Sequence, residues 1–171
     1  MDKAEWVRTA LREHEGVLIR YASQITGDLD RARDVVQDTF LKLCGESPAR
    51  LDGHLREWLF TVCRNRARDV VRKEQRMKPL EEARLETTVA RESSPADQAE
   101  TNESSRQVER LVAALPDNQR EVVRLKFQSG LSYKEISHIT DLSVSNVGFL
   151  IHTAMKTLRT QMQNEEGFSA P

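Results

Sequence analysis

Residues 80–105 cannot contribute much to a hydrophobic core, and this segment limits how the rest of the chain can fold. The segment carries seven acidic and two basic side chains. Its apolar residues are Leu80, Ala83, Leu85, Val89, Ala90, Ala96 and Ala99. Burying so little apolar surface does not offset the entropy that a chain loses when it becomes ordered. We therefore expect an acidic linker over 80–104, with a short helical turn near 80–86, between two small domains at 1–79 and 105–171.

Both flanking domains show the three- and four-residue spacing of amphipathic helices and none of the alternation that is typical of strands. The expected fold class is therefore all-α. Hydrophobic residues make up 38% of the chain, below the roughly 45–50% of a single compact globule, which agrees with a small or divided core. In the first domain the expected helices cover about 3–26 (as one or two helices), 29–44 and 54–77. In the second domain they cover about 105–114, 116–129, 133–140 and 144–163.

The second domain carries the signals of a helix-turn-helix. Ser132 and Glu135 have the spacing of a capping box, in which a hydroxyl and a carboxylate bond to free amides at the start of a helix. Gly130 suits the left-handed end of the preceding helix, and Ser143 caps the following one after a turn at Asp141-Leu142. Two helices joined by a tight turn and preceded by a supporting helix are the pattern of a helix-turn-helix.

Positive charge is concentrated on the helix expected over 54–77. Residues 54–78 carry eight Lys and Arg side chains against three acidic ones. On a helical wheel the apolar side comprises Leu55, Leu59 and Val62, and the opposite ridge comprises Arg64, Arg68 and Arg72. Such a ridge is typical of a surface that contacts nucleic-acid phosphates. The alternative that stays open is a solvated face with an ion pair between Asp69 and Lys73.

The helix expected over 29–44 presents a mixed surface of charged, amide and aliphatic side chains. This surface comprises Asp34, Gln37, Asp38, Leu41 and Lys42. Carboxylates at Asp34 and Asp38 are spaced to share a divalent ion, but neither a third ligand nor a phosphate-binding loop accompanies them. A protein-binding face or a solvated face is therefore favoured over a metal site.

Two aromatic residues, Trp58 and Phe60, follow loop 45–53. Exposed rings at this place would stack on unpaired bases, an interaction that tolerates any base sequence. The wheel position of Trp58 favours a place in the core instead.

No signal of catalysis, cofactor binding or membrane insertion is present. Cys44 and Cys63 do not form a C-x-x-C pair, so we expect two reduced thiols on helices. The histidines are scattered, at His14, His54, His138 and His152, which argues against a metal site. No apolar run approaches the ~18 residues that a membrane span needs, and the N-terminus lacks an apolar signal segment. We therefore expect a cytoplasmic protein.

Two blocks of motifs resemble a known family. The first block comprises Asp34-Val-Val-Gln-Asp-Thr-Phe40, Leu55-Arg-Glu-Trp-Leu-Phe-Thr-Val-Cys-Arg-Asn65 and Asp69-Val-Val-Arg72. The second comprises Leu115-Pro116 with Arg120, Gly130-Leu-Ser-Tyr-Lys-Glu-Ile136 and Leu142-Ser-Val-Ser145. In this order they resemble the second and fourth regions of bacterial RNA polymerase sigma factors of the extracytoplasmic-function (ECF) class. The resemblance spans nearly the whole chain, with the linker where that family has one.

The resemblance implies a promoter-specificity subunit that binds core RNA polymerase, recognises and melts promoter DNA, and has no catalytic chemistry. The residues implied to dock on the clamp helices of the largest polymerase subunit are Asp34, Gln37, Asp38, Phe40, Leu41 and Lys42. Those implied to bind and open the minus-ten element, together with loop 45–53, are Arg64, Asn65, Arg68, Arg72, Lys73 and Arg76. Those implied to contact the minus-thirty-five element are Ser132, Tyr133, Lys134, Ser143, Ser145, Asn146, His152 and Lys156. The linker would thread toward the polymerase catalytic channel, and an anti-sigma factor or another protein regulator is an expected partner.

The start of the recognition helix departs from the family pattern. Family members usually carry basic or hydroxyl residues there, whereas residues 145–150 are uncharged and Lys156 and Arg159 come late. Base readout would then depend on Ser145 and Asn146, with helix N-terminal amides holding a phosphate. Phe149 and Leu150 would pack the domain or meet a regulator.

Two rival functions remain. An autonomous helix-turn-helix regulator accounts for the second domain alone and leaves the arginine ridge unexplained. A helical adaptor that binds only proteins agrees with the net charge of -1 and predicts no salt-sensitive binding to nucleic acid.

Overall fold

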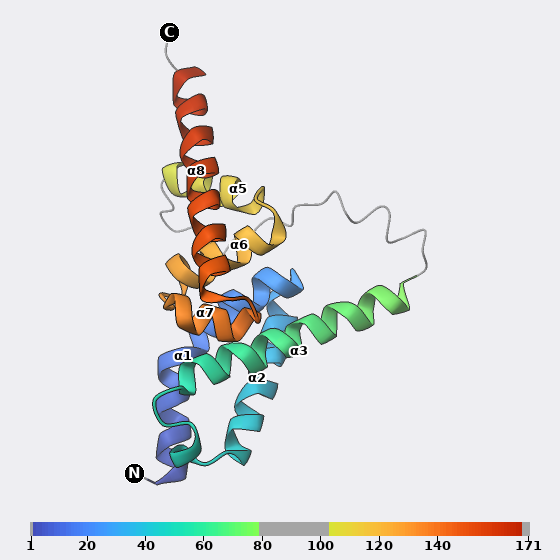
Figure 1. The fold of residues 1–171 in the computed structure, drawn as a ribbon. Coiled ribbons are helices and arrows are strands. Elements are labelled where there is room, and N and C mark those ends of the chain that lie inside the picture. The colour runs from blue at the N-terminus through green and yellow to red at the C-terminus, as the bar shows by residue number, and fades with distance from the viewer. Residues whose placement is uncertain (1, 79–102, 169–171) are drawn as a thin grey trace. The chain divides into compact units, whose positions relative to one another are not determined.

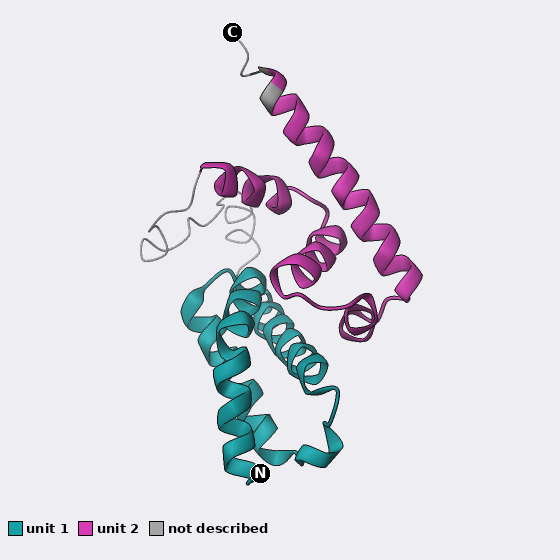
Figure 2. Cartoon of the chain, turned by 90° about the vertical axis from the view of Figure 1, so that its left-hand side faces the viewer, with its two compact units in different colours: residues 1–91 teal, residues 92–171 magenta. Residues whose placement is uncertain are grey.

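The computed structural model describes residues 2–78 and 103–168, and the regular structure within these ranges is entirely helical. The chain divides into two compact units, Met1–Arg91 and Glu92–Pro171 (Figure 2). The all-α expectation is confirmed. Most of the expected linker, including the turn near 80–86, lies outside the described residues, but its last two residues belong to a helix that begins at Glu103.

Three long helices build the first unit, and each packs against the other two (Figure 1). They are α1 (Lys3–Thr26), α2 (Leu29–Gly45) and α3 (Leu55–Met77). Their bounds agree with the expected ranges to within one residue, and 3–26 forms one helix. The loop between α2 and α3 contains a single 3₁₀ turn, η1 (Pro48–Arg50).

The core of the first unit is made of apolar side chains from all three helices. Leu18, Leu43, Leu59 and Phe60 are among the largest fully buried side chains. The rings of Tyr21 and Phe60 lie 5.3 Å apart between centroids in a tilted arrangement. Burial of each such side chain stabilises the fold by about 1.5–3 kcal/mol relative to exposure.

Local hydrogen bonds explain where α1 ends and α2 begins. Gly27 adopts a left-handed φ of 71°, and its amide donates to the Ser23 carbonyl at 2.8 Å. This geometry suits glycine because it has no Cβ. The Asp28 carboxylate then accepts from the Arg31 amide at 2.9 Å and caps α2.

The second unit packs shorter helices against one long helix. Its elements are α5 (Glu103–Ala113), α6 (Asp117–Val123), the π-helical segment η4 (Arg124–Gln128), α7 (Tyr133–Thr140) and α8 (Val144–Phe168). The last helix, expected over 144–163, continues to Phe168. The core of the second unit includes the fully buried Val122, Leu125, Leu131, Ile136 and Val147. A second apolar cluster joins α5, α6 and α8 through Leu111, Val112, Leu115, Val123, Ala154 and Leu158.

The helix expected over 116–129 changes character after Val123. The Ser129 amide donates to the Arg124 carbonyl at 3.1 Å, which is the wider i to i+5 pattern of a π-helix. Gly130 follows with a φ of 66°, as its left-handed role predicts. The wider last turn and this glycine let the chain leave the helix and enter the Leu131–Ser132 segment.

The helix-turn-helix is confirmed by its caps. The Ser132 amide donates to the Glu135 carboxylate at 2.7 Å, and the Ser132 hydroxyl accepts from the Glu135 amide at 3.2 Å, which completes the capping box. Asp141 makes the turn with a φ of 63°. The Ser143 hydroxyl accepts from the Asn146 amide at 3.1 Å and caps α8. No helix within residues 2–78 and 103–168 has the length and hydrophobicity needed to cross a bilayer.

Candidate nucleic-acid and protein-binding surfaces

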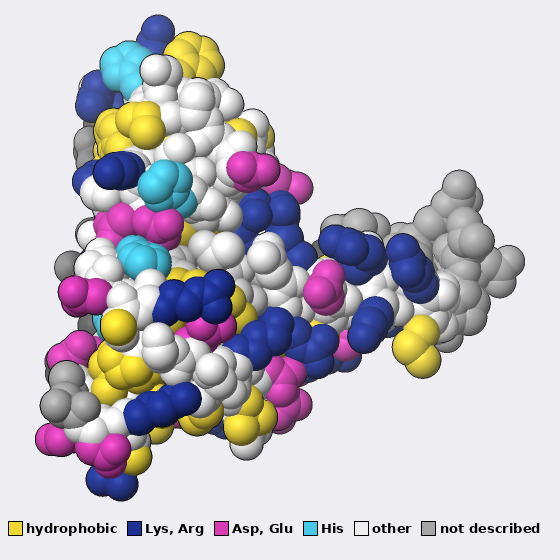
Figure 3. All heavy atoms as spheres, turned by 60° about the horizontal axis from the view of Figure 1, so that its bottom comes forward, with side chains coloured by type: hydrophobic (Ala, Val, Ile, Leu, Met, Phe, Trp, Pro, Cys, Tyr) yellow, Lys and Arg dark blue, Asp and Glu magenta, His cyan; other side chains and the backbone are white. Residues whose placement is uncertain are grey.

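The exposed face of α3 carries most of the expected cations. Asn65, Arg68, Arg72, Lys73 and Arg76 are all exposed. In the space-filling view, Lys and Arg side chains gather along α3 (Figure 3). The Arg72 guanidinium lies 3.6 Å from the Asp69 carboxylate, one turn earlier on the same exposed surface. A pair of this kind contributes less than about 1 kcal/mol, so it does not prevent Arg72 from binding a phosphate.

Arg64 does not belong to this exposed face, and its expected place on the ridge is wrong. Its exposed fraction is only 9%. On α3 the buried side is set by Leu59, Phe60, Cys63 and Ala67, whereas Leu55 and Val62 are half-buried. Arg64 lies four residues after Phe60, which is about 40° away around the helix, and therefore falls on the packed side.

The aromatic residues after loop 45–53 are not a free stacking platform. Phe60 is buried and its ring lies against Tyr21, so it is not available to a base. Trp58 is half-buried, so it is neither a fully exposed ring for stacking nor a fully buried core residue.

The exposed face of α2 has a prominent leucine. Leu41 is 64% exposed, and Asp34, Gln37 and Lys42 are also exposed. A single exposed leucine is common on protein surfaces, so its exposure agrees both with a protein-binding face and with a solvated face.

Phe40 and Asp38 differ from the other residues of that expected docking set. Phe40 is 6% exposed and packs in the core of the first unit, so direct docking by its ring is wrong. The Asp38 carboxylate accepts from Arg66 Nε of α3 at 2.7 Å, within the same unit. Because this bond occupies part of its carboxylate, Asp38 already has a structural role.

Two ion pairs link α2 to α3. Besides Asp38 and Arg66, the Arg31 guanidinium lies 2.7 Å from the Glu74 carboxylate. All four side chains are partly exposed, so each pair is a modest contributor to stability. They lie near the middle and the far end of α3, where they add to the apolar packing that fixes the direction of its exposed face. Neither pair is visible in the sequence, because partners 28 and 43 residues apart leave no local pattern.

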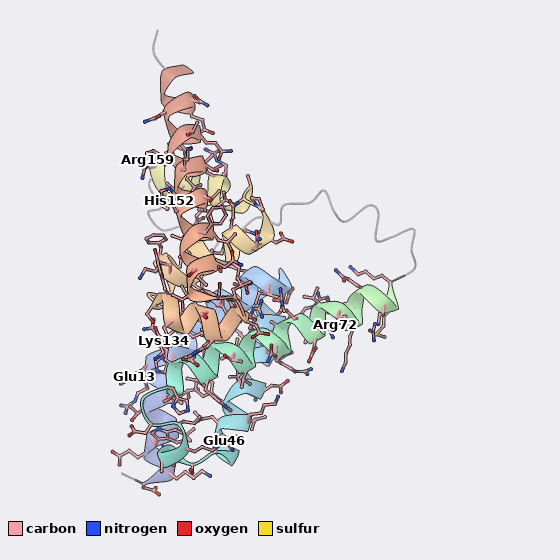
Figure 4. The ribbon with its side chains drawn as sticks, in the orientation of Figure 1. Glu13, Glu46, Arg72, Lys134, His152 and Arg159 are labelled. Carbon is pink, nitrogen blue, oxygen red and sulfur yellow. The ribbon has the colours of Figure 1, made fainter. Side chains whose placement is uncertain are left out.

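In the second unit the expected contact residues all reach the surface. Ser132, Tyr133 and Lys134 are exposed at the start of α7, and Ser143, Ser145, Asn146, His152 and Lys156 are exposed at the start of α8 or along it. Lys134, His152 and Arg159 project to the same side in Figure 4. Arg159 is exposed as well and extends this face further along α8. The surface contains hydroxyl, amide, imidazole and cationic groups, which are the donors and acceptors used in contacts with bases and phosphates.

Phe149 and Leu150, each expected either to pack the domain or to meet a regulator, have different environments. Leu150 is 7% exposed and packs the domain. Phe149 is 66% exposed on the face of α8 that carries Ser145 and His152.

Tyr133 connects the two helices of the helix-turn-helix. The Lys126 ammonium lies 5.2 Å from the centroid of its ring, a cation–π contact. A Cβ placed on Gly148 of α8 would lie 3.5 Å from Tyr133 Cε2, so the ring packs against the α8 backbone. This contact holds α7 close to the first turns of α8.

Titratable groups away from these surfaces have environments set by burial. Burial raises the pKa of the Cys63 thiol to about 12, so this cysteine stays protonated and unreactive. Burial also lowers the pKa of Arg124, and Arg120 nearby adds to this effect. Within residues 2–78 and 103–168 no group of three or more His, Cys, Asp or Glu side chains is arranged to hold a metal ion.

Family models match both units in chain order. A model for Sigma-70 region 2 matches residues 10–77, which span most of the three-helix unit. A model for Sigma-70 region 4 matches residues 105–158, which include the helix-turn-helix.

Curated relatives cover most of the chain. The ECF RNA polymerase sigma factor SigM of Bacillus subtilis is 30% identical over 141 residues, covering 82% of this chain and 85% of the relative. The ECF RNA polymerase sigma factor SigL of Mycobacterium tuberculosis is 30% identical over 176 residues, covering 94% of this chain and 91% of the relative.

Solved structures show the same fold. The sigma factor RpoE, in its complex with the anti-sigma factor NepR from Bartonella quintana, superposes with a TM-score of 0.68 at 24% identity, over 91% of this chain and 96% of that chain. CnrH, in its complex with the cytosolic domain of CnrY, superposes with a TM-score of 0.61 at 25% identity, over 92% of this chain and 88% of that chain.

Proposed function

The chain belongs to the ECF class of RNA polymerase sigma factors, and from that premise we propose how its surfaces divide the work of starting transcription. Its function is that of a promoter-specificity subunit, which binds core RNA polymerase and promoter DNA and has no enzymatic activity of its own. In the proposed division, residues 1–79 dock on the polymerase and open the minus-ten element, and residues 105–171 hold the minus-thirty-five element. Residues 80–104 join them and thread toward the polymerase catalytic channel.

The proposed polymerase-docking residues are Asp34, Gln37, Leu41 and Lys42 on α2. Leu41 supplies an apolar anchor, and the polar residues around it supply a rim. Phe40 supports this face from the core, and Asp38 acts through its bond to Arg66. We therefore assign these two residues to positioning rather than to direct contact.

The proposed minus-ten surface consists of Asn65, Arg68, Arg72, Lys73 and Arg76 together with loop 45–53. Cationic side chains along one face follow the phosphates of a separated strand. A surface that binds the separated strand more tightly than the duplex shifts the promoter toward the open state. Arg64 is left out of this surface because its side chain is buried.

The proposed minus-thirty-five surface is the start and exposed face of α8, supported by α7. In a helix-turn-helix the N-terminal residues of the second helix reach base edges in the major groove. Ser145 and Asn146 would read bases, while Ser143 and the first amides of α8 would lie near a phosphate. Lys156, His152 and the α7 residues Ser132, Tyr133 and Lys134 would contact the backbone or flanking bases.

An anti-sigma factor or another protein regulator is the proposed inhibitory partner. Sigma factor RpoE, which shares the fold, forms such a complex with NepR. Exposed apolar side chains on both units, including Leu41 and Phe127, offer contacts for a partner of this kind. Because RNA polymerase works on chromosomal DNA, we propose that the protein acts in the cytoplasm.

The observation that carries this proposal is the presence of both surfaces on one chain, in the order of the region 2 and region 4 models. A helix-turn-helix regulator would need only the second. The test is run-off transcription from a library with randomised promoter elements. We expect core polymerase with this chain to start transcripts that core polymerase alone does not start. Specific duplex binding by the chain alone at physiological salt, without such transcripts, would favour the autonomous regulator instead.

A further inference from the structure

The exposed ring of Phe149 is the feature of the recognition helix that the proposed function does not use. Phe149 is 66% exposed, although its neighbour Leu150 is buried. Leaving a phenylalanine side chain in water forgoes the stabilisation that burial provides. The ring is therefore not used for packing within the unit and is available for contact with another molecule.

Phe149 lies within the polar face of α8 that is proposed to enter the major groove. Exposed residues follow one another at four- and three-residue steps, which keeps them on one side of the helix: Ser145, Phe149, His152, Lys156 and Arg159. Phe149 is about 4.5 Å further along the helix axis than Asn146. That distance is close to one base-pair step of about 3.4 Å, so with α8 in the major groove the ring would face a base pair next to those that Ser145 and Asn146 reach.

The surroundings of Phe149 favour DNA over a protein partner. Its neighbours on this face are a serine, an imidazole and cations rather than further apolar residues. Residues 142–164 contain no Asp or Glu, and include Lys156 and Arg159. A face without acidic side chains does not repel a polyanion. A single ring in such a face suits a small apolar target.

We propose that Phe149 contacts the C5-methyl group of a thymine in the minus-thirty-five element and selects for thymine at that position. This inference rests on the proposed function, since it requires α8 to lie in the major groove. The thymine methyl is the apolar group that base edges display there, and phenylalanine is among the side chains that contact it. The contact compensates for the small number of charged residues at the start of α8.

The experiment compares thymine with deoxyuridine, which differs only by that methyl group. A promoter is first selected with the holoenzyme from a library randomised in the upstream element. Each thymine of the selected element, on both strands, is then replaced in turn by deoxyuridine, and holoenzyme binding is measured by competition. We expect one position at which the wild-type holoenzyme prefers thymine about fourfold, the effect of burying one methyl group. Phe149→Ala should bring this ratio to about one.

Matched variants separate the possible failures. Phe127→Ala removes another exposed ring, 58% exposed on η4, and should keep the thymine preference. Lys156→Ala should weaken binding to the thymine-containing and the deoxyuridine-containing promoter equally, because a phosphate contact carries no base information. Circular dichroism checks that each variant keeps its helical content.

Equal binding of thymine and deoxyuridine by the wild type at every position would overturn the inference, as would a preference that survives in Phe149→Ala. If Lys156→Ala weakens binding while the wild type shows no preference, the inference fails and the groove assignment stands. If neither Lys156→Ala nor Phe149→Ala changes promoter binding, α8 does not face DNA and the proposed function of the second unit fails too. A Phe149 that serves only a protein regulator would give no thymine preference in the wild type and unchanged promoter binding in Phe149→Ala, which also overturns the inference.

Discussion

The two proposed DNA-binding helices, α3 and α8, differ in how they are charged. Residues 54–78 carry eight basic and three acidic side chains, whereas residues 144–168 carry two basic and two acidic ones, and both acidic ones lie near the C-terminal end of α8. Charge attracts phosphates without regard to base sequence, and it is sensitive to salt. Hydroxyl, amide and apolar groups distinguish bases instead. The comparison indicates that the first unit contributes strand capture and the second contributes sequence choice.

The two helices also differ in how they are anchored. α3 is fixed on α2 by a buried apolar face and by the ion pairs of Asp38 with Arg66 and of Arg31 with Glu74. In α8 the anchor is apolar packing, with Val147, Ile151 and Ala154 buried, and Tyr133 holds α7 against it. Variants that act on one helix alone therefore test whether the units work separately.

The largest expected effect comes from breaking the core of the first unit. Phe60→Ala should lower its free energy of unfolding by about 3–5 kcal/mol, because it leaves a cavity where the ring packed. Both tryptophans, Trp6 and Trp58, lie in this unit. Tryptophan fluorescence during urea unfolding of the full chain therefore measures this unit selectively.

The matched control for this variant lies in the other unit. Val122→Ala removes buried apolar atoms near α8 and should leave the tryptophan transition at the same urea concentration. Movement of that transition in Val122→Ala would show that the two units unfold together, and the comparison between them would no longer hold.

A smaller effect is expected from removing exposed charge on α3. Arg68→Ala with Arg72→Ala should reduce open-complex formation and lower the slope of log affinity against log salt by about 1.4, if each contacts one phosphate of a single strand. Permanganate reactivity of unpaired thymines measures the open complex at several salt concentrations. Arg8→Ala with Arg33→Ala removes the same charge from other exposed positions of this unit and should change neither quantity. Unchanged opening in the first double variant excludes these arginines from the DNA surface.

A docking variant tests the third surface, which lies on neither DNA helix. Leu41→Ala should weaken the affinity for core polymerase about tenfold, since truncating a central apolar anchor costs more than about 1 kcal/mol. Fluorescence anisotropy of the labelled chain against core enzyme measures this affinity. Leu29→Ala also removes an exposed leucine of α2 and should bind as the wild type does. Equal losses for both variants would contradict the assignment.

A capping-box variant tests the stability of the second unit alone. Ser132→Ala should lower the stability of this unit by about 1 kcal/mol, because the Glu135 amide loses its hydroxyl acceptor. Hydrogen exchange of the α7 amides measures the change. Ser132→Asp restores a cap and should recover most of the stability; failure to do so would assign the loss to another cause.

The smallest effect is a pH dependence confined to the first unit. Burial lowers the pKa of His14 below 6.5, with Arg56 also lowering it and Glu13 opposing. The unfolded chain therefore takes up this proton at a higher pH than the folded chain does, so His14 makes stability fall as the pH falls below 6.5. His14→Gln should reduce this dependence in tryptophan-detected unfolding. An identical pH profile in the variant would rule out His14 as its source.

Local signals predicted the helices well. Gly27, Asp28, Ser132 and Ser143 each end or begin a helix through a hydrogen bond that spans a few residues. Such bonds depend on neighbours in the chain, so their residue types and spacing are visible in the sequence. The exposure of most of the proposed contact residues was predicted for the same reason, since the face of a helix is a matter of periodicity.

The predictions were wrong where packing against neighbouring helices determines whether a side chain is buried. The wheel placed Arg64 opposite Leu55, but the contact surface of α3 is centred on Phe60 and Cys63, and Arg64 is buried with them. Phe40 was assigned to docking from a resemblance, although its ring completes the core of the first unit.

The sequence by itself determined the division into two helical units, most of the helix ends and the family, because charge, apolar periodicity and caps are properties of contiguous residues. Only the tertiary structure decided which side of α3 is buried, that Asp38 is held by Arg66, and that Phe149 is exposed while Leu150 is buried. These outcomes depend on how helices distant in sequence pack on one another. A one-residue difference around a helix, about 100°, is enough to move a side chain from the core to the solvent.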